Sequence, residues 1–342
     1  MSAPVEKTLA IQFKYLGDAV FITPALRALK EHRPAAELHV LVAAEVAPLL
    51  EHLPWIQRVW ALPRTRGRAR LRDSLPFVRS LRKEEFARVV DFGGNDRGSI
   101  MSFLSGAPIR LGPVDKKRLL QKFGYTQTVA VATLPPSWVQ HHLGLLAAWQ
   151  IPPPQSLRLE IAADPALAEQ AAPLLPAGSV LCHLGTSQPR KEWPPARWQE
   201  FYRLARAAGY HLVFSSGTNA REQALLTELK KLEPEAPVLP KTASLKLFLA
   251  VLKRAKAVVA GDTGPLHFAA GLGVPIVGLF ATGDSLLKAA PIYSAAQVVR
   301  GGECFCDVKQ LHSATCADAS PCIGGIRAEE VLARLMVVCP HV

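Results

Sequence analysis

Residues 257–267 read AVVAGDTGPLH and form the most informative stretch of the chain. A run of small and β-branched residues forms a buried strand, the polar turn DTG follows, and Pro265 suits the first helical position, where its missing N–H costs nothing. The N–H groups and dipole of that helix start favour an anion. Thr263 adds a hydroxyl and Asp262 a carboxylate for a sugar or ribose hydroxyl, while His267 points back toward the turn. A capped helix with a satisfied core histidine explains the same spacing, so this turn alone leaves both interpretations open.

Strand-like and helix-like segments alternate on both sides of this stretch. The expected strands are 9–15, 39–44, 89–92, 109–111, 128–132, 179–184, 211–215, 257–260 and 275–280. The expected helices are 20–31, 46–53, 197–208, 221–232, 244–255 and one that starts at Pro265. Gly209 is expected to end the third of these helices and Ser244 to cap the start of the fifth. This alternation predicts an α/β protein with parallel sheets covered by helices on both faces.

A proline-rich stretch interrupts the alternation. Residues 151–154 read IPPP and cannot form regular structure, because proline lacks the N–H donor and restricts the residue before it. Asp164 and Pro165 then open a short alanine-rich helix. We therefore predict two Rossmann-like, doubly wound domains, residues 1–165 and 166–342, with ligands bound outside the carboxyl ends of their strands.

The composition limits the kinds of function that the chain can have. The chain has 342 residues, 49% of them hydrophobic and 20% charged, and a formal net charge of +12. No apolar stretch reaches the roughly 20 residues of a membrane-spanning helix, and residues 1–7 do not resemble a signal peptide. The expected compartment is the cytoplasm. The positive charge favours an anionic partner: a phosphate-bearing substrate, a membrane surface or nucleic acid.

A second polar loop follows the strand at 179–184. Residues 182–194 read CHLGTSQPRKEWP, where Gly185 permits close approach of the backbone. Thr186 and Ser187 offer hydroxyls and amides to phosphate oxygens. Lys191 can offset the charge that builds on a departing nucleoside diphosphate. The alternative is a polar loop whose lysine is solvated, and the presence of two phosphate-compatible loops in one half disfavours it.

An aspartate, Asp18, follows the first expected strand. Residues 15–18 read YLGD, and Asp18 there could act as a general base that takes the proton of an acceptor hydroxyl. Capping of the following helix is the other role of an aspartate in this position, and spacing alone favours it.

Together these segments resemble glycosyltransferase family 9, the heptosyltransferase family, over nearly the whole chain and in the family's order. Four stretches carry the resemblance: LGD with TPALRAL at 16–29, KEWP with RW at 191–198, the G…E loop at 217–222, and DTGPLH at 262–267. The chain departs from the family's usual aliphatic run at Lys14 and Tyr15, so the identity of the acceptor does not carry over.

The resemblance implies a GT-B fold and sugar transfer with inversion from an ADP-heptose-like nucleotide-diphosphate sugar, without a catalytic metal or required cofactor. On that template Asp18 is the base and Lys191 assists the leaving diphosphate. The implied donor-binding residues are Thr186, Ser187, Glu222, Asp262, Thr263, Gly264 and His267. The acceptor would lie against the N-terminal half.

Two basic clusters in the first half suggest how an acidic acceptor is held. Arg64, Arg66 and Arg68 open an alternating arginine segment that continues to Arg72, and a second cluster comprises Lys116, Lys117, Arg118 and Lys122. A phosphorylated lipid-linked saccharide, or the anionic leaflet that carries it, explains both, so we expect peripheral contact with the inner membrane. A solvated loop explains the arginine segment equally well. Nucleic acid is disfavoured because no aromatic residues interleave these charges.

The six cysteines fall into two groups. Cys182 and Cys339 stand apart and are expected to be buried and chemically inert. Cys304, Cys306, Cys316 and Cys322 gather near the C-terminus, but C-x-C is not the usual zinc knuckle. Reduced packing cysteines are the favoured interpretation, and structural zinc or an iron–sulfur cluster is the alternative.

The leading hypothesis is therefore an envelope-glycan glycosyltransferase. Its rivals are a nucleotide-sugar-binding protein without catalysis and a GT-B sugar-nucleotide epimerase, which would need no acceptor. The donor sugar and base, the acceptor, the linkage and the oligomeric state do not follow from the sequence.

Overall fold

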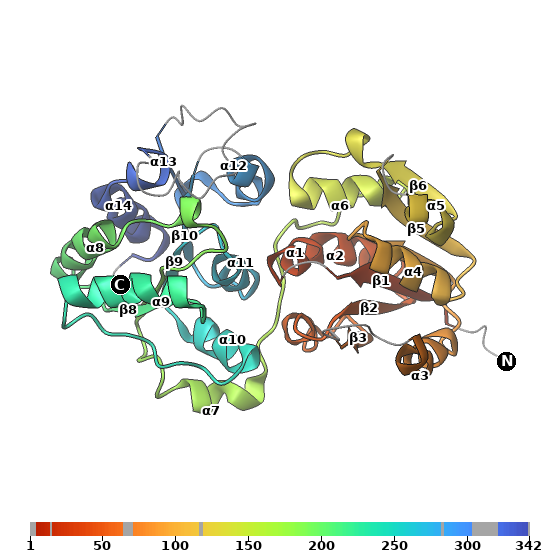
Figure 1. Cartoon of the computed structure of the whole chain (residues 1–342), viewed down its shortest axis with the longest axis horizontal. Coiled ribbons are helices and arrows are strands. Elements are labelled where there is room, and N and C mark those ends of the chain that lie inside the picture. The colour runs from red at the N-terminus through yellow and green to blue at the C-terminus, as the bar shows by residue number, and fades with distance from the viewer. Residues whose placement is uncertain are drawn as a thin grey trace. The chain divides into compact units, whose positions relative to one another are not determined.

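The computed structural model describes residues 5–13, 16–63, 71–115, 119–281, 284–302 and 321–340. Its contacts divide the chain into two compact units, Met1–Ala162 and Ala163–Val342. The division falls three residues before the boundary expected at residue 165. Both units are α/β, and each holds one sheet whose paired strands all run parallel (Figure 1).

The N-terminal unit holds a six-stranded sheet of order β3-β2-β1-β4-β5-β6. Its strands are β1 Lys7–Gln12, β2 Glu37–Ala43, β3 Arg58–Leu62, β4 Arg88–Asp91, β5 Ile109–Val114 and β6 Gln127–Ala130. Its helices are α1 Leu16–Phe21, α2 Thr23–His32, α3 Leu71–Arg82, α4 Asp96–Leu104, α5 Leu119–Gly124 and α6 Trp138–Leu146. This strand order is that of the dinucleotide-binding Rossmann fold.

The C-terminal unit holds a five-stranded sheet of order β11-β10-β9-β7-β8. Its strands are β7 Val180–His183, β8 Leu212–Ser215, β9 Ala257–Gly261, β10 Ile276–Phe280 and β11 Val298–Arg300. Its helices are α7 Ala168–Ala171, α8 Pro195–Ala207, α9 Ala220–Leu232, α10 Leu245–Arg254, α11 Gly264–Gly271, α12 Asp284–Lys288, α13 Pro321–Gly324 and α14 Ala328–Val338. This order is the other common doubly wound arrangement, so the predicted α/β class is confirmed for both halves.

Local sequence signals explain several boundaries. Gly209 follows α8 with φ of 87°, and the N–H groups of Gly209 and Tyr210 donate back to Arg206 and Ala205, as predicted for a glycine that ends a helix. The Ser244 hydroxyl accepts the N–H of Leu247 at 3.2 Å and caps α10 as predicted.

Two helix predictions need correction. The segment 20–31 is not one helix: α1 ends at Phe21 and α2 begins at Thr23, where the Thr23 hydroxyl donates to the carbonyl of Val20. The segment 46–53 holds only the 3₁₀ turn Ala47–Leu49, because Pro48 and the next proline, Pro54, leave too few residues for a stable α-helix.

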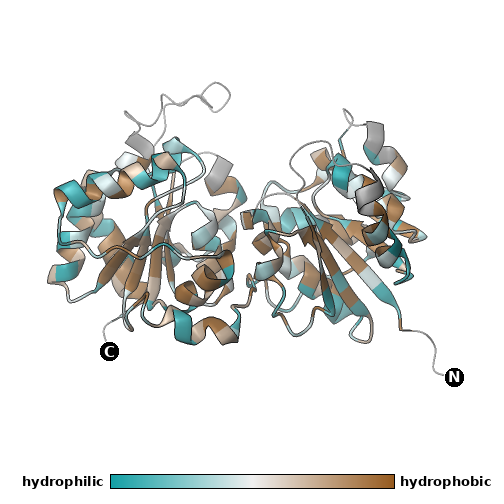
Figure 2. Cartoon of the chain, turned by 60° about the horizontal axis from the view of Figure 1, so that its bottom comes forward, coloured by the Kyte–Doolittle hydropathy of each residue, from teal (hydrophilic) through white to brown (hydrophobic). Residues whose placement is uncertain are grey.

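The two sheets lie at the centre of their units, and Figure 2 shows their strands as largely hydrophobic. Burial of strand residues such as Leu9, Ile11, Val258 and Val259 is complete, as parallel strands covered on both faces require. Cys182 and Cys339 are buried and unpaired, as predicted, and burial raises the pKa of both thiols. Within the described ranges no helix is long and apolar enough to cross a bilayer.

Candidate functional site

The sheet of the C-terminal unit has a topological switch point between β7 and β9. These strands are neighbours, but the chain leaving β7 crosses to β8 on one side, whereas the chain leaving β9 crosses to β10 on the other. The loops beyond the two strands therefore diverge, and ligands of such sheets bind in the crevice that this divergence creates. The loop 184–194 follows β7, and the turn 262–263 follows β9.

Lys191, Asp262 and His267 meet at this switch point. The Lys191 ammonium donates to Asp262 Oδ2 at 2.5 Å, and His267 Nε2 lies 3.2 Å from Asp262 Oδ1. All three side chains are largely buried. A carboxylate accepts hydrogen bonds only, so Nε2 of His267 carries the proton in this contact. This ion pair brings the turn after β9 and the loop after β7 together across 71 residues of sequence.

The charges around Asp262 keep it ionised. Burial opposes the ionised form, but the hydrogen bond and charge of His267, together with those of Lys191, outweigh it and hold the pKa of Asp262 well below its usual range. An ammonium has three donors, and Asp262 occupies one of those of Lys191. Within the part of the chain that the structure describes, no second hydrogen bond of this ammonium is found, so two donors can serve phosphate oxygens.

Aromatic packing anchors the loop that carries Lys191. Trp193, two residues on, is fully buried, its ring lies 4.9 Å from that of Trp198, and its indole N–H donates to the carbonyl of Ile326. Gly261 lets the loop approach the end of β9, because a Cβ there would lie 2.9 Å from the carbonyl oxygen of Lys191. The tryptophans of the KEWP…RW segment therefore pack in the core and fix the position of Lys191.

Thr186 and Ser187 occupy different environments. Thr186 is buried, and its hydroxyl donates to the carbonyl of Gln188 at 2.6 Å. The hydroxyl proton is therefore used in a hydrogen bond within the loop. Arg221 binds the carbonyl of Thr186 and pairs with Glu192, which ties the loop to α9. Ser187 is exposed at the loop surface.

The start of α11 offers fewer donors than the sequence suggested. Thr263 is the N-cap, and its side chain makes no capping bond. Pro265 stands second in the helix and has no N–H, while the N–H of Leu266 already donates to the carbonyl of Thr263 at 3.2 Å. An anion here would therefore be held chiefly by the Lys191 ammonium, the Thr263 hydroxyl and the amide of Gly264.

Glu222 lies beneath two glycines at the same edge of the sheet. It sits in the first turn of α9, where its N–H donates to the Asn219 side chain, and its own side chain is largely buried. A Cβ on Gly217 would overlap the Glu222 carboxylate, and one on Gly185 would lie 2.8 Å from Glu222 Cγ. Both glycines are therefore required by the space that Glu222 occupies.

We expect Gly217→Ala to lower the free energy of unfolding by about 1–3 kcal/mol, because the added methyl must displace a buried side chain. Gly324→Ala is the matched control, since its Cβ would meet only Pro194 at an ordinary 3.6 Å. Urea unfolding of both variants measures the difference. Superimposable curves for Gly217→Ala and the wild type would show that Glu222 does not need this space.

Tyr293 extends the polar chain and was not predicted. Its hydroxyl lies 2.6 Å from Nδ1 of His267, and the two rings are nearly parallel. With Asp262 at Nε2 and Tyr293 at Nδ1, both ring nitrogens of His267 have a polar partner. Burial, and then the charge of Asp262, raise the pKa of Tyr293 well above its usual value. No motif marks Tyr293, because it contacts the site across 26 residues from a 3₁₀ segment.

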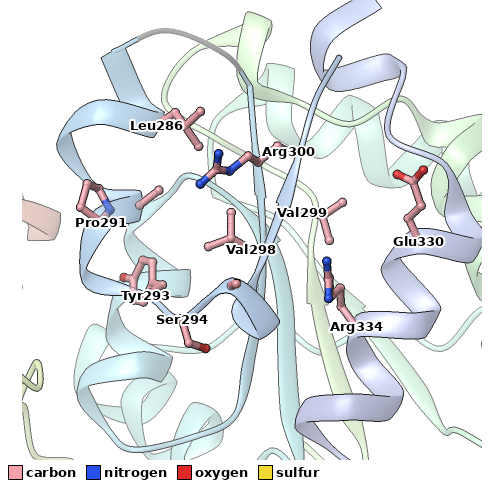
Figure 3. Close-up of a pocket in the computed structure, with 11 residues that line it drawn as sticks. Leu286, Pro291, Tyr293, Ser294, Val298, Val299, Arg300, Glu330 and Arg334 are labelled. Atoms are coloured by element: carbon pink, nitrogen blue, oxygen red, sulfur yellow. The ribbon is translucent and has the colours of Figure 1, made fainter. Parts of the chain in front are cut away.

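Tyr293 also lines a pocket of about 630 Å³ beside β11 (Figure 3). Arg300 and Arg334 reach its wall from β11 and α14. No sequence pattern indicated this pocket, because its walls come from residues 286–300 together with Glu330 and Arg334 of α14.

Asp18 lies in the N-terminal unit, in the first turn of α1 and partly buried. The helix begins at Leu16, so Asp18 is its third residue and does not stand in the N-cap position that spacing favoured. The sheet of this unit has its own switch point between β1 and β4, and α1 follows the carboxyl end of β1. Asp18 is thus at the edge where ligands of such sheets bind.

Some predicted residues lie outside the described ranges. These are Arg64, Arg66 and Arg68, Lys116, Lys117 and Arg118, and the cysteines Cys304, Cys306 and Cys316, while Lys122 in α5 and Cys322 in α13 have no described side chain. Among the side chains that the structure does describe, no three His, Cys, Asp or Glu residues are grouped to hold a metal ion. Reduced packing cysteines therefore stay the prediction, with structural zinc or an iron–sulfur cluster as the alternative.

Comparison with known proteins places these observations in one family. The model of "Glycosyltransferase family 9 (heptosyltransferase)" matches residues 75–316, more than half of the chain. Lipopolysaccharide heptosyltransferase 1 of Pseudomonas aeruginosa is 28% identical over 319 residues, which cover 88% of this chain and 85% of that protein.

Two solved structures share the fold. The family 9 glycosyltransferase of Veillonella parvula aligns with a TM-score of 0.79 at 19% identity, covering 99% of this chain and 98% of that one. The ADP-heptose lipopolysaccharide heptosyltransferase II of Escherichia coli aligns with a TM-score of 0.73 at 18% identity, covering 97% and 98%.

Proposed function

The chain belongs to glycosyltransferase family 9, the heptosyltransferases, and from this premise we propose that it moves a heptose or a similar sugar from an ADP-sugar to a lipopolysaccharide core or related envelope glycan. It is a glycosyltransferase with the GT-B fold. The proposed transfer proceeds with inversion and without a catalytic metal.

The observation that carries the proposal is the Lys191–Asp262–His267 cluster at the β7/β9 switch point. A departing ADP needs a cation near its β-phosphate, and we assign that role to Lys191, which the ionised carboxylate of Asp262 holds at the switch point. Preorganised charge of this kind stabilises a transition state because it needs no reorganisation during the reaction. The name of the Escherichia coli structural relative, an ADP-heptose transferase, supports ADP as the nucleotide.

In the proposed reaction the acceptor hydroxyl attacks the anomeric carbon as the bond from that carbon to the β-phosphate oxygen breaks. Asp18 takes the proton of the hydroxyl, and both electrons of the broken bond leave with ADP. Lys191 stabilises the charge that develops on the diphosphate.

The other donor-binding residues are proposed from where they lie in the C-terminal unit. Ser187, Thr263 and the amide of Gly264 are proposed to bind phosphate oxygens, with the backbone of Thr186 shaping the loop. Glu222 is proposed for the ribose hydroxyls, since a carboxylate accepts two hydrogen bonds. Asp262 and His267 line the donor sugar or its phosphates.

The acceptor-binding residues are proposed from the positive charge of the N-terminal half. Arg64, Arg66 and Arg68 would bind the acidic groups of the acceptor. A lipid-linked acceptor places the enzyme in the cytoplasm at the inner face of the membrane, with peripheral contact.

Thermal unfolding in the presence of nucleotides tests the donor assignment. A ligand at 100 times its Kd stabilises the folded protein by about 2.7 kcal/mol. We expect ADP and ADP-heptose to raise the Tm, and UDP-sugars at the same concentration to leave it unchanged. Stabilisation by UDP-sugars alone would contradict the assignment.

Tyr293→Phe is expected to lower kcat/KM by roughly tenfold, because His267 loses the hydrogen bond that fixes its ring, a contribution near 1.4 kcal/mol. Tyr210→Phe is the matched control, since Tyr210 is a buried tyrosine of the same unit whose hydroxyl donates to the carbonyl of Cys339 at 2.8 Å. Its removal should cost similar stability and no activity. Equal activity of both variants would remove Tyr293 from the site.

A further inference from the structure

The pocket beside β11 lies apart from the loops that carry Lys191 and Asp262. In the sheet of the C-terminal unit β11 is the outermost strand, and β10 and β9 lie between it and β7. Neighbouring strands are about 4.8 Å apart, so roughly 12 Å separate β11 from the β7/β9 switch point. The pocket is therefore separate from the place proposed for the donor phosphates.

Much of the pocket wall is apolar. Val298 and Val299 are buried strand residues that line it, and Leu286 and Pro291 come from the segment after β10 (Figure 3). The volume of about 630 Å³ is within the range of small-molecule sites. It is also many times the ~30 Å³ that a water molecule occupies in the liquid. An inorganic anion alone would leave most of this space empty, so the pocket suits a ligand with a hydrocarbon body.

Two arginines make the pocket positively charged. Arg300 reaches it from the end of β11 and Arg334 from α14, and among the residues that the structure describes neither has an acidic partner. The described carboxylate of the wall, that of Glu330, already pairs with Arg327 at 2.9 Å. A guanidinium is always charged, and its N–H fork matches a phosphate. Two of them balance the charge of almost −2 that a phosphate monoester carries at neutral pH.

Tyr293 connects this pocket with the Lys191–Asp262–His267 cluster. Its ring lines the pocket, whereas its hydroxyl lies 2.6 Å from Nδ1 of His267. The planes of the phenol and the imidazole differ by only 5°. His267 in turn contacts Asp262, which binds the Lys191 ammonium. A ligand packed against the Tyr293 ring would restrict its motion and thereby favour the assembled cluster.

We propose that this pocket is a second ligand site, which binds a phosphate monoester with an apolar body and thereby raises the affinity of the chain for ADP. The phosphate pairs with Arg300 and Arg334, and the body lies against the valines of β11 and the ring of Tyr293. Because the first ligand already orders Tyr293, less conformational entropy is lost when the second binds. Linkage requires that ADP raise the affinity for the monoester by the same factor. The coupling rests on the proposed function, in which ADP is the donor nucleotide, whereas binding of the monoester does not.

Isothermal titration calorimetry on the full chain tests the proposal, with phenyl phosphate as the probe. We expect one phenyl phosphate to bind per chain. Phenol and inorganic phosphate each lack one of the two recognised groups and should bind at least about tenfold more weakly. Saturating ADP should lower the Kd of phenyl phosphate at least about fivefold, and saturating phenyl phosphate should lower the Kd of ADP by the same factor.

Three variants assign these effects to residues. Arg300→Gln/Arg334→Gln should weaken phenyl phosphate binding at least about tenfold and leave ADP binding without phenyl phosphate unchanged. The matched control Arg203→Gln/Lys231→Gln removes two exposed cations of the same unit and should bind like the wild type. Tyr293→Phe should still bind phenyl phosphate, but the coupling factor should fall toward one, because the ring no longer bonds to the cluster.

Several results would overturn the proposal. Absence of phenyl phosphate binding, or equal binding by the double arginine variant and the wild type, would remove the site. Displacement of phenyl phosphate by ADP would show that the probe occupies the donor site. An ADP affinity that phenyl phosphate leaves unchanged would refute the coupling. If the wild type bound phenyl phosphate but no ADP, the pocket would stand as a phosphate monoester site and the ADP assignment of the proposed function would fail.

Discussion

Asp18→Asn is expected to lower the rate of sugar transfer by about 10²- to 10⁴-fold, the range that general base catalysis supplies. The amide is nearly isosteric with the carboxylate but cannot take a proton from the acceptor hydroxyl. Donor binding should persist, because the proposed donor contacts all belong to the other unit. Release of ADP in the presence of acceptor measures the rate, and the rise in Tm on adding ADP measures donor binding.

Asp96→Asn is the matched control. Asp96 is also an acidic residue in the first turn of a helix of the N-terminal unit, but it is exposed. Its loss should leave transfer unchanged. If Asp18→Asn transferred sugar at the wild-type rate, Asp18 would be a structural residue of α1 and the base would have to be sought elsewhere.

Lys191→Met is expected to reduce kcat by about 10²- to 10³-fold, as does removal of a single preorganised charge from other transition states. The methionine fills a similar volume but leaves the developing charge on ADP without its cation. The substitution also leaves His267 as the remaining described partner of Asp262. Breaking a buried ion pair lowers the free energy of unfolding by about 3–5 kcal/mol.

Two further variants separate these effects. Lys191→Arg keeps the charge and should regain most of the stability, with only part of the activity, because a guanidinium differs in shape from an ammonium. Lys253→Met removes a cation of the same unit that binds the carbonyl of Leu272, and it should retain full activity. Wild-type kcat in Lys191→Met would contradict the proposed role of Lys191.

The ion pair also predicts a pH dependence of stability. The pKa of Asp262 is lower in the folded protein than in the unfolded chain, so its contribution is complete above the unfolded value of about 3.9 and is lost as the pH falls toward the folded value. The stability difference between wild type and Lys191→Met should therefore be constant near neutral pH and shrink only in acid, once Asp262 becomes protonated in the folded variant.

The sequence was most informative where chemistry and periodicity agreed. The alternation of strands and helices predicted both sheets, and the segments around Lys191 and Asp262 predicted two loops that the structure joins through one ion pair. Helix α4 was not predicted, because its inner face carries Gly98 and Ser99 and the apolar Phe103 faces outward, which hides the usual periodicity.

Contacts between distant segments could not be predicted from the sequence. Tyr293 forms a hydrogen bond with His267 because a 3₁₀ turn after α12 brings it back to the end of β9. The residues around Tyr293 contain no pattern that predicts this course of the chain. The burial of Thr186 was likewise unexpected, since its hydroxyl binds within its own loop. Local polar patterns locate a loop, whereas tertiary packing decides which of its side chains remain available.

We propose that the enzyme transfers a sugar from an ADP-sugar with inversion. The most direct test of this proposal is incubation of the purified protein with ADP-heptose and a lipopolysaccharide acceptor that lacks the heptose, followed by mass spectrometry and NMR of the product. We predict one ADP released for each heptose gained by the acceptor, and a glycoside whose anomeric configuration is opposite to that of the donor. Retained configuration, or conversion of the donor to an isomer without acceptor, would contradict the account.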